Sequence, residues 1–247
     1  MTVTAGARPW LSIAAPCYNE EEAIAAVVAE WDAILGAVPQ PTEIVLCNDG
    51  STDGTAAVLA ELMARYPRLR VVSNPTNGGY GRALGSAIAA THGTYVATID
   101  SDGQFDVADA VVLAGAVERE GFDGITGFRL GKKDTAFRVL ADRGMNLLVR
   151  TMFGVQLRDT NCALKVVRGD LLRGLPIEAR GYPTPTEMCV RLVARGYRLG
   201  ERGVTHRERT AGFSKLHPWR TAWSFFRFLV YLRLKLKLHR AGIILAP

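Results

Sequence analysis

About the first hundred residues alternate between short apolar runs and longer segments in which apolar side chains recur at helical spacing. The apolar runs predict buried strands, and the segments between them predict amphipathic helices. The predicted strands are Trp10–Ala15, Glu43–Cys47, Leu69–Ser73 and Thr94–Ile99, and the predicted helices are Glu20–Gly36, Asp53–Arg65 and Tyr80–Ala90. Repeated strand–helix units with short links favour an α/β fold, in which helices cover both faces of a mostly parallel sheet.

The pattern becomes less regular in the second half of the chain. It predicts helices at Asp106–Glu120, Thr135–Phe153 and about Glu187–Arg195, a strand at Phe122–Phe128, and a glycine- and proline-marked loop at Gly181–Pro185. The sequence contains no internal repeat and no clear linker. We therefore expect one domain over residues 1–217, followed by a C-terminal tail over residues 218–247.

The cysteines and the N-terminus bear on the compartment. The 4 cysteines are scattered without the spacing of a zinc site, which favours reduced thiols over disulfides or bound zinc. Residues 1–9 contain no apolar stretch of the kind found in a secretory signal. Both features predict a cytoplasmic location.

The net charge of +6 is concentrated at the C-terminus. No acidic residue follows Glu208, whereas that last segment carries eight lysines and arginines, and the rest of the chain is close to neutral. The basic character is therefore a property of the tail rather than of the whole chain.

Polar motifs follow each of the four predicted strands in the first half. They are Pro16-Cys17-Tyr18-Asn19-Glu20, residues 48–55, residues 74–79 and residues 100–104. Parallel α/β sheets bind ligands beyond the carboxyl ends of their strands. We therefore predict a binding site at this edge of the sheet.

The last of these motifs, Asp100-Ser101-Asp102-Gly103-Gln104, has the residues of a divalent-cation site. Two carboxylates released from a strand end can turn toward one point, Gln104 adds a neutral oxygen, and Gly103 permits the tight bend. A cation held there could neutralise the phosphates of a nucleotide-activated substrate. The alternative is a polar turn without a ligand.

Taken together, the motifs resemble those of the family 2 glycosyltransferases, which are inverting enzymes with a Rossmann-like GT-A fold. Pro16–Glu20 resembles the P-x-Y-N-E of the family, Asn48–Thr55 its D-D-G-S-x-D-x-T, and Asn77–Ala83 its N-x-G-x-x-x-A. The dolichyl- or polyprenyl-phosphate sugar synthases of this family are most similar. They share the D-x-D-G-Q of residues 100–104 and an R-x-x-G-x-S-K motif, here residues 209–215.

Two further elements support that resemblance. Gly127-Phe128-Arg129 is similar to a G-x-R that these enzymes carry. Residues 159–165 are similar to their D-x-x-x-G-F-K, although Ala163-Leu164 replaces the Gly-Phe pair.

The resemblance implies a metal-dependent, inverting transfer of a sugar from a nucleoside-diphosphate sugar to a polyprenyl phosphate, with Mn²⁺ or Mg²⁺ as the cofactor. It implies that the nucleoside and the metal are held from the first half of the chain, and that Arg129, Arg143, Arg209 and Lys215 of the second half also bind the nucleotide sugar. Pro16, Tyr18, Glu20 and Asp49 would hold the nucleoside, Asp100 would face the ribose or the metal, and Asp102 and Gln104 would contact the metal. For Asn19-Glu20 and for Asp53, helix capping is the alternative role.

The phosphates of the substrates are assigned to basic residues. Arg129 and Arg143 are candidates because a planar guanidinium binds phosphate through two parallel hydrogen bonds. By resemblance, Arg209, Ser214 and Lys215 would contact the donor diphosphate or the acceptor phosphate, so that Asp102, Arg129, Arg209 and Lys215 would carry catalysis. A solvated helix is the alternative for Arg143, and a solvated loop is the alternative for Arg209, Ser214 and Lys215. Two roles stay open for Lys132-Lys133, closing over the substrate and keeping their loop soluble.

The chemistry of the reaction favours a phosphate acceptor. A phosphate monoester is already anionic and attacks without a general base, whereas an alcohol needs one. The enzyme then has to align the two groups and neutralise their charge. Two alternatives stay open, a soluble hydroxyl acceptor with Glu187 or His206 moving the proton, and a non-catalytic nucleotide-sugar-binding protein.

The tail interleaves aromatic and leucine residues with arginines and lysines over Trp219–Arg240. Its uncharged runs are too short to span a bilayer. As a helix it would carry an apolar stripe of Phe225, Leu229, Leu232 and Leu236, which predicts a helix lying on the cytoplasmic face of an anionic membrane, alone or with a separate membrane-protein partner. The alternatives are a helix packed on the protein and, from the alternation over Leu232–Leu238, a strand. No nucleic-acid recognition motif is present, and no motif fixes the sugar, the nucleotide or the oligomeric state.

Overall fold

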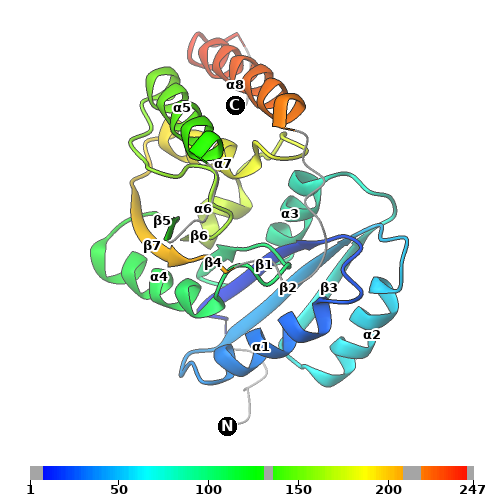
Figure 1. Ribbon diagram of the computed structural model, residues 1–247. Coiled ribbons are helices and arrows are strands. Elements are labelled where there is room, and N and C mark those ends of the chain that lie inside the picture. The colour runs from blue at the N-terminus through cyan, green and yellow to red at the C-terminus, as the bar shows by residue number, and fades with distance from the viewer. Residues whose placement is uncertain (1–7, 131–135, 208–217, 244–247) are drawn as a thin grey trace.

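A sheet of seven strands forms the centre of the molecule, with helices on both faces (Figure 1). This computed structural model describes residues 8–130, 136–207 and 218–243. The strand order is β3-β2-β1-β4-β6-β5-β7. The elements of the first half are β1 (Leu11–Cys17), α1 (Ile24–Gly36), β2 (Thr42–Asp49), α2 (Thr55–Arg65), β3 (Leu69–Asn74), α3 (Tyr80–Ala89) and β4 (Tyr95–Thr98). They confirm the predicted α/β alternation, and the four strands are parallel.

The second half completes the sheet. Its elements are α4 (Val107–Glu120), β5 (Gly124–Leu130), α5 (Ala136–Phe153), β6 (Lys165–Arg168), α6 (Gly169–Arg173), α7 (Thr184–Ala194), β7 (Leu199–Thr205) and α8 (Pro218–Arg240). Strand β6 runs antiparallel to both β4 and β5, and β7 runs parallel to β5. Helix α7 begins at Thr184, inside the segment predicted as a loop.

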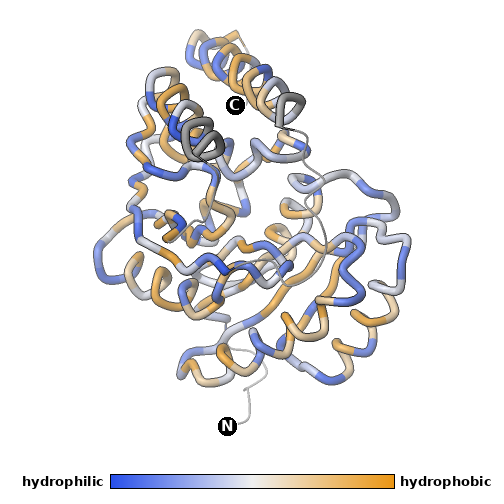
Figure 2. The backbone as a smooth tube through the Cα atoms, viewed as in Figure 1, coloured by the Kyte–Doolittle hydropathy of each residue, from blue (hydrophilic) through white to orange (hydrophobic). Residues whose placement is uncertain are grey.

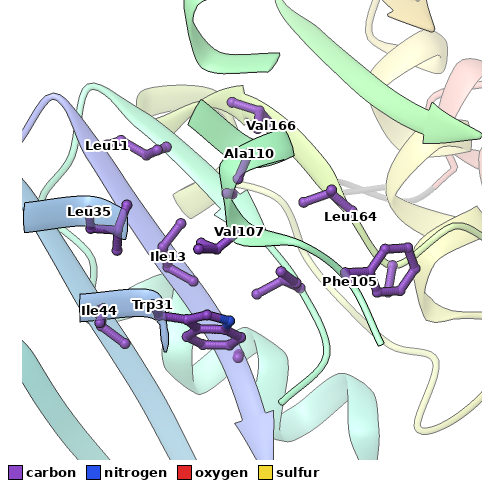
Figure 3. Close-up of a cluster of buried hydrophobic side chains, with 14 of the residues drawn as sticks. Leu11, Ile13, Trp31, Leu35, Ile44, Phe105, Val107, Ala110, Leu164 and Val166 are labelled. Atoms are coloured by element: carbon purple, nitrogen blue, oxygen red, sulfur yellow. The ribbon is translucent and has the colours of Figure 1, made fainter. Parts of the chain in front are cut away.

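Alternating side chains of the central strands enter two separate cores. Ile13 and Ile44 belong to a cluster that includes Trp31 and Leu35 of α1 (Figure 3), whereas their neighbours Ala14 and Val45 belong to a second cluster. That second cluster includes Leu84 and Ile88 of α3 and Met188 and Leu192 of α7. Because successive residues of a strand point to opposite faces, an apolar run buries both faces of the sheet.

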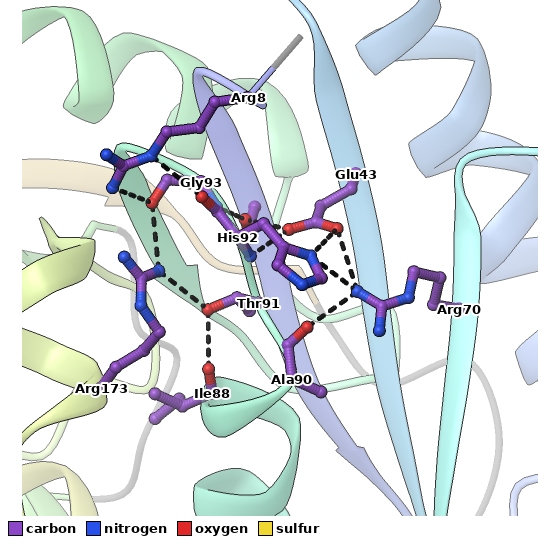
Figure 4. Close-up of polar contacts among 10 residues, drawn as sticks. Arg8, Glu43, Arg70, Ile88, Ala90, Thr91, His92, Gly93 and Arg173 are labelled. Carbon is purple, nitrogen blue, oxygen red and sulfur yellow. Dashed lines mark hydrogen bonds and ion pairs between the residues drawn. The ribbon is translucent and has the colours of Figure 1, made fainter. Parts of the chain in front are cut away.

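The starts of the strands are joined by a polar network around Glu43, which is 7% exposed (Figure 4). The Ser12 hydroxyl and the His92 backbone N–H each donate to Oε1 of Glu43 at 2.6 Å, and Arg70 Nη1 lies 3.5 Å from its Oε2. Burial alone would raise the pKa of Glu43, but the hydrogen bonds from Ser12 and His92 outweigh burial and lower it. The carboxylate thus links β1, β2, β3 and the turn before β4.

Helix α8 packs on α5 and α7 through a third apolar cluster. Phe225, Leu229, Leu232 and Leu236 are at most 8% exposed and contact Val149 of α5 and Cys189 and Val190 of α7. The prediction that this stripe faces a membrane is therefore wrong, because the apolar faces of α5 and α7 cover it. The segment is a helix rather than a strand.

A different face of α8 is exposed. Trp223, Phe226, Val230 and Leu234 are 62%, 41%, 46% and 57% exposed, and Figure 2 shows hydrophobic and hydrophilic residues mixed along the coloured part of the helix. Among the described residues, no helix combines the length and the apolar character that are needed to cross a bilayer.

Candidate active site

A cleft of about 330 Å³ lies at the carboxyl ends of β1, β2 and β4, where the sequence predicted a site. The parallel register places Cys17 opposite Asn48 and Asp49 opposite Asn74, so that the polar loops leave the sheet at one edge. The residues that line the cleft are Pro16, Tyr18, Glu20, Asp49, Asn77, Gly79, Tyr80, Ala83, Asp100, Ser101 and Asp102. The strand-end motifs contain five residues that were expected to hold the nucleotide sugar, and all five line the cleft, as does Asp102. They are Pro16, Tyr18, Glu20, Asp49 and Asp100. Gln104, Arg129 and Arg143 do not line it.

The first two loops are tied together through Asn19, a non-glycine residue with a φ of +54°. Its side-chain oxygen accepts a hydrogen bond from Thr52 N at 2.8 Å, and its backbone N–H donates to the Ser51 hydroxyl at 3.1 Å. Helix α1 begins only at Ile24, so Asn19 does not cap it. The alternative of simple helix capping is therefore wrong for Asn19, whose contacts shape the cleft instead.

Asp53 lies just before helix α2. Its Oδ1 accepts from Thr55 N at 3.0 Å and from the Thr55 hydroxyl at 2.6 Å. The residue at the N-cap position is Gly54. Asp53, which was expected at that position, lies one residue before it and stabilises the start of α2 from there.

Asp49 holds the third loop from its buried position at the end of β2. Its carboxylate accepts from Gly78 N at 3.0 Å, from Gly79 N at 2.9 Å and from Asn74 Nδ2 at 2.7 Å. Gly79 has a φ of +88°, and a Cβ there would lie 2.3 Å from the carbonyl oxygen of Arg180. Asp49 thus fixes a glycine loop whose backbone can closely approach a ligand.

The two carboxylates of the metal motif are oriented by their neighbours. The Tyr80 hydroxyl donates to Asp100 Oδ1 at 2.8 Å, and Gln104 N donates to Asp102 Oδ1 at 3.1 Å. Burial, and then the negative charge of Asp100, raise the pKa of Tyr80 well above its usual value, so Tyr80 remains a hydrogen-bond donor. Sequence reasoning did not assign a role to Tyr80, and its only signal was its position in the Asn77–Ala83 motif.

Gln104 faces the end of β7 instead of the cleft. Its side-chain nitrogen donates to Arg207 O at 3.3 Å, and Arg207 N donates to Gln104 O at 2.7 Å. Arg207 also pairs with Glu30 at 2.7 Å and with Asp106 at 2.6 Å. The structure therefore does not bring the expected third metal ligand together with Asp100 and Asp102.

The described part of this segment ends at Arg207. Arg209, Ser214 and Lys215, to which phosphate contacts were assigned, lie outside the described residues, as do Lys132 and Lys133.

The donor set suits a cation that arrives with its substrate. Among the residues that the structure describes, no group of three or more His, Cys, Asp or Glu side chains could hold a metal ion. Four carboxylates line the cleft, those of Glu20, Asp49, Asp100 and Asp102, and the last two belong to the predicted metal motif. Mg²⁺ is commonly bound through one or two carboxylates, with substrate phosphates and water completing its shell. The site fits such a shared cation.

Arg129 is held by Asp159 in a two-pronged ion pair. Its Nε donates to Oδ2 at 2.7 Å and its Nη2 to Oδ1 at 3.1 Å, and Asp142 lies 3.9 Å away. Burial would lower the pKa of Arg129, but the hydrogen bonds and charge of Asp159 raise it above the usual value, so Arg129 stays a cation. Arg143 is exposed on α5.

Lys165, at the other end of the Asp159–Lys165 element, anchors the loop that precedes it. Lys165 is 1% exposed, and its ammonium donates to the Thr126 hydroxyl at 3.0 Å and to the carbonyls of Thr160 and Cys162 at 3.1 Å and 2.5 Å. A buried ammonium needs such partners. Lys165 therefore supports the loop that carries the partner of Arg129.

Glu187, the candidate base for a hydroxyl acceptor, is completely buried away from the cleft. Its carboxylate accepts from the backbone N–H groups of Glu178 and Ala179 at 3.0 Å and 2.8 Å, and from Arg191 Nε at 2.7 Å. A base must reach its substrate proton, so this assignment is wrong. His206 packs against the Phe105 ring, with the ring centroids 4.9 Å apart.

Comparisons with known proteins agree on one family. The model of the Glycosyl transferase family 2 matches residues 12–171. A dodecaprenyl-phosphate galacturonate synthase of Rhizobium johnstonii is 30% identical over 213 residues, which are 85% of this chain and 63% of the relative. An undecaprenyl-phosphate 4-deoxy-4-formamido-L-arabinose transferase of Yersinia enterocolitica is 28% identical over 83% of this chain and 62% of its own length. The chain thus spans under two thirds of both relatives.

Among solved structures, a glucosyl-3-phosphoglycerate synthase from Mycobacterium tuberculosis has a TM-score of 0.67 at 25% identity, over 96% of this chain and 81% of that one. It was crystallised with Mn²⁺, uridine-diphosphate-glucose and phosphoglyceric acid, and also with Mg²⁺ and uridine diphosphate. A mannosyl-3-phosphoglycerate synthase from Rubrobacter xylanophilus shares the fold, with a TM-score of 0.71 at 19% identity, over 96% of this chain and 76% of that one.

Proposed function

Because this chain belongs to glycosyl transferase family 2, we propose that it transfers a sugar from a nucleoside-diphosphate sugar to a polyprenyl phosphate, with inversion at the anomeric carbon. The observation that carries this proposal is the cleft in which Asp100 and Asp102 lie beside the loops of the nucleotide motifs. Relatives named as polyprenyl-phosphate sugar transferases support the choice of acceptor.

The nucleotide sugar is assigned to the floor of the cleft. Pro16, Tyr18 and Glu20 would contact the nucleoside, and the glycine loop held by Asp49 would approach the phosphates. Asp100 and Asp102 would hold a Mn²⁺ or Mg²⁺ ion, with Tyr80 and the backbone of Gln104 fixing the carboxylates. A bound cation would stabilise the charge that develops on the departing diphosphate.

The acceptor phosphate needs no base, and the burial of one candidate base, Glu187, supports this part of the proposal. Glu187, the carboxylate proposed as a base for an alcohol, is committed to Arg191 and to backbone N–H groups. Attack by the phosphate from the face opposite the leaving group inverts the anomeric carbon. Arg129, Arg143, Arg209 and Lys215 stay predictions for charge neutralisation, and Asp159 would orient Arg129 in that role.

A lipid-linked acceptor places the enzyme at a membrane surface. We assign that contact to the exposed face of α8, which carries Trp223, Phe226, Val230 and Leu234, and the cations Arg227 and Lys237 on this helix are also exposed. Each cation near an anionic surface contributes about 1 kcal/mol. The cytoplasmic face, with or without a membrane-protein partner, belongs to this proposal.

A soluble acceptor is the second candidate. The structural neighbour crystallised with phosphoglyceric acid favours it, because that ligand is a small phosphorylated acid. Both candidates share the donor site and the metal. They differ in the attacking oxygen, which belongs to a lipid phosphate in the first candidate and to a hydroxyl of a soluble molecule in the second.

An acceptor competition distinguishes the two candidates. The purified chain, with Mn²⁺, is given a panel of labelled nucleotide sugars together with undecaprenyl phosphate in vesicles or with 3-phosphoglycerate. We expect label in the lipid fraction, and we expect Asp102→Asn to reduce the rate of sugar transfer by about a hundredfold or more. Asp170→Asn, an exposed carboxylate paired with Arg168, is the matched control and keeps activity. Labelled glycosyl phosphoglycerate without labelled lipid would establish the second candidate. Transfer of label to neither acceptor would reject both.

A further inference from the structure

A second cavity, of about 210 Å³, lies between α7 and α8 and shares no residue with the cleft. It is lined by Arg191, Ala194, Arg195, Leu236, His239 and Arg240. Three of these side chains are arginines and one is a histidine, none is acidic, and the reaction at the cleft uses none of them. A water molecule occupies about 30 Å³ of liquid, so the cavity has room for a small polyatomic anion.

Arg191 is the innermost of these cations and is 1% exposed. Its Nε donates to Glu187 Oε1 at 2.7 Å, and its Nη2 forms an ion pair with Glu178 Oε2 at 2.9 Å. Among the described residues, neither Nη1 nor Nη2 has a partner with hydrogen-bond geometry. Buried donors are rarely left without one, and each such case calls for an explanation. A ligand with acceptor oxygens in the adjoining cavity would supply it.

The charges around the cavity favour an anion. Glu178 and Glu187 are the carboxylates in contact with Arg191, and Glu178 also pairs with Lys235 and accepts from the Tyr231 hydroxyl. Against these two acids stand Arg191, Lys235, Arg195 and Arg240, so the cluster keeps a positive excess. Arg195 and Arg240 are exposed at the mouth, where Arg195 donates to Gly174 O at 3.3 Å.

We propose that this cavity binds a phosphate group, carried either by the headgroup of an anionic phospholipid or by a free phosphorylated molecule. Guanidinium groups form strong, paired hydrogen bonds with phosphate oxygens. Ala194 and Leu236 would contact the apolar part of an ester. Because the lining comes from both helices, a bound phosphate bridges the ends of α7 and α8.

Isothermal titration of the full chain with inorganic phosphate, without divalent cations and at constant ionic strength, tests the proposal. We expect saturable binding of one phosphate per chain. The double variant Arg195→Gln, Arg240→Gln removes only exposed side chains and should weaken binding by about tenfold or more. The control Arg65→Gln, Arg119→Gln removes two exposed arginines from the last turns of α2 and α4 and should bind as the wild type does.

A vesicle assay then identifies the source of the phosphate. Phosphatidylcholine vesicles with and without phosphatidic acid are sedimented with each protein, with and without competing inorganic phosphate. If the wild type sediments with the vesicles, if phosphate competes, and if the cavity variant Arg195→Gln, Arg240→Gln no longer sediments, the ligand is a lipid headgroup. If that variant loses phosphate binding but sediments as the wild type does, the ligand is a free phosphorylated molecule. Equal phosphate affinity in the wild type and the cavity variant, or no binding at all, would overturn the proposal. The basic side chains would then only balance the negative ends of the α7 and α8 helix dipoles.

Discussion

Two buried carboxylates at opposite ends of β2 show how single residues serve either stability or the site. Glu43, near the start of the strand, collects hydrogen bonds from Ser12 and His92 and joins the starts of neighbouring strands. Asp49, at the end of the strand, collects them from Gly78 and Gly79 and shapes the cleft. The same chemistry therefore stabilises one edge of the sheet and builds the ligand-binding edge.

Substitution of Glu43 by glutamine tests the stabilising role. The loss of a charged acceptor should lower the free energy of unfolding at pH 7 by about 1–3 kcal/mol. Because the folded pKa of Glu43 lies below its ordinary value of 4.5, its stabilisation is present above that pH and is lost as the pH falls through the folded pKa. Urea denaturation should show the wild type and the variant converging below about pH 4.5. A constant difference down to pH 3, or an equal loss in the exposed control Glu61→Gln, would contradict this account.

Substitution of Asp49 by asparagine tests the loop-shaping role. An amide nitrogen would face the N–H groups of Gly78 and Gly79, so donors would oppose donors. We expect faster hydrogen exchange in residues 77–79 and an affinity for the nucleotide reduced by about tenfold, as for a lost hydrogen bond to a charged group. Unchanged exchange in that loop would show that Asp49 does not hold it.

At the scale of elements, helix α8 has two apolar faces with different surroundings. Leu229 is fully buried against α5 and α7, and Leu234 on the same helix is 57% exposed. The periodicity of the sequence predicted the buried face correctly as an apolar stripe, but we expected that stripe to face a membrane. A pattern of residues does not reveal which apolar surface will cover it.

The two leucines provide a matched pair of substitutions. Leu229→Ala should destabilise the protein by about 2–5 kcal/mol, because it leaves a cavity. Leu234→Ala should change stability by less than about 0.5 kcal/mol but weaken binding to anionic vesicles. Denaturation and vesicle sedimentation measure the two effects, and a reversal of the pattern would mean that the faces are wrongly assigned.

The strands that sequence reasoning missed have physical reasons for being missed. Strand β6 is short and opens with Lys165, whose buried ammonium is satisfied by residues that only the fold brings near. Strand β7, Leu199–Thr205, contains two glycines and two charged residues and carries no apolar run. The strands of the first half were predicted to within about two residues. Strands β1, β2 and β4 are apolar runs buried almost throughout, whereas in β3 only Leu69 is buried.

At the scale of the molecule, the parallel sheet explains how much of the site could be predicted. Six of the expected residues converge on the cleft because parallel strands end at one edge, which the strand–helix pattern already implies. The antiparallel strand β6 joins the second half of the chain to β4, and this topology could not be predicted. The contact of Gln104 with Arg207 and that of Glu187 with Arg191 also depend on how the second half of the chain folds, which the motif spacing does not reveal.

The central claim is that Asp100 and Asp102 bind a divalent cation together with a nucleoside diphosphate. Calorimetric titration of uridine, guanosine, adenosine, cytidine and thymidine diphosphates, with and without Mn²⁺, tests it directly. The account predicts that at least one of them binds with Mn²⁺ and that chelation, or Asp102→Asn, weakens that binding by about tenfold or more. Binding that is equal without Mn²⁺ or in the variant, or no Mn²⁺-dependent binding of any of the five, would contradict it.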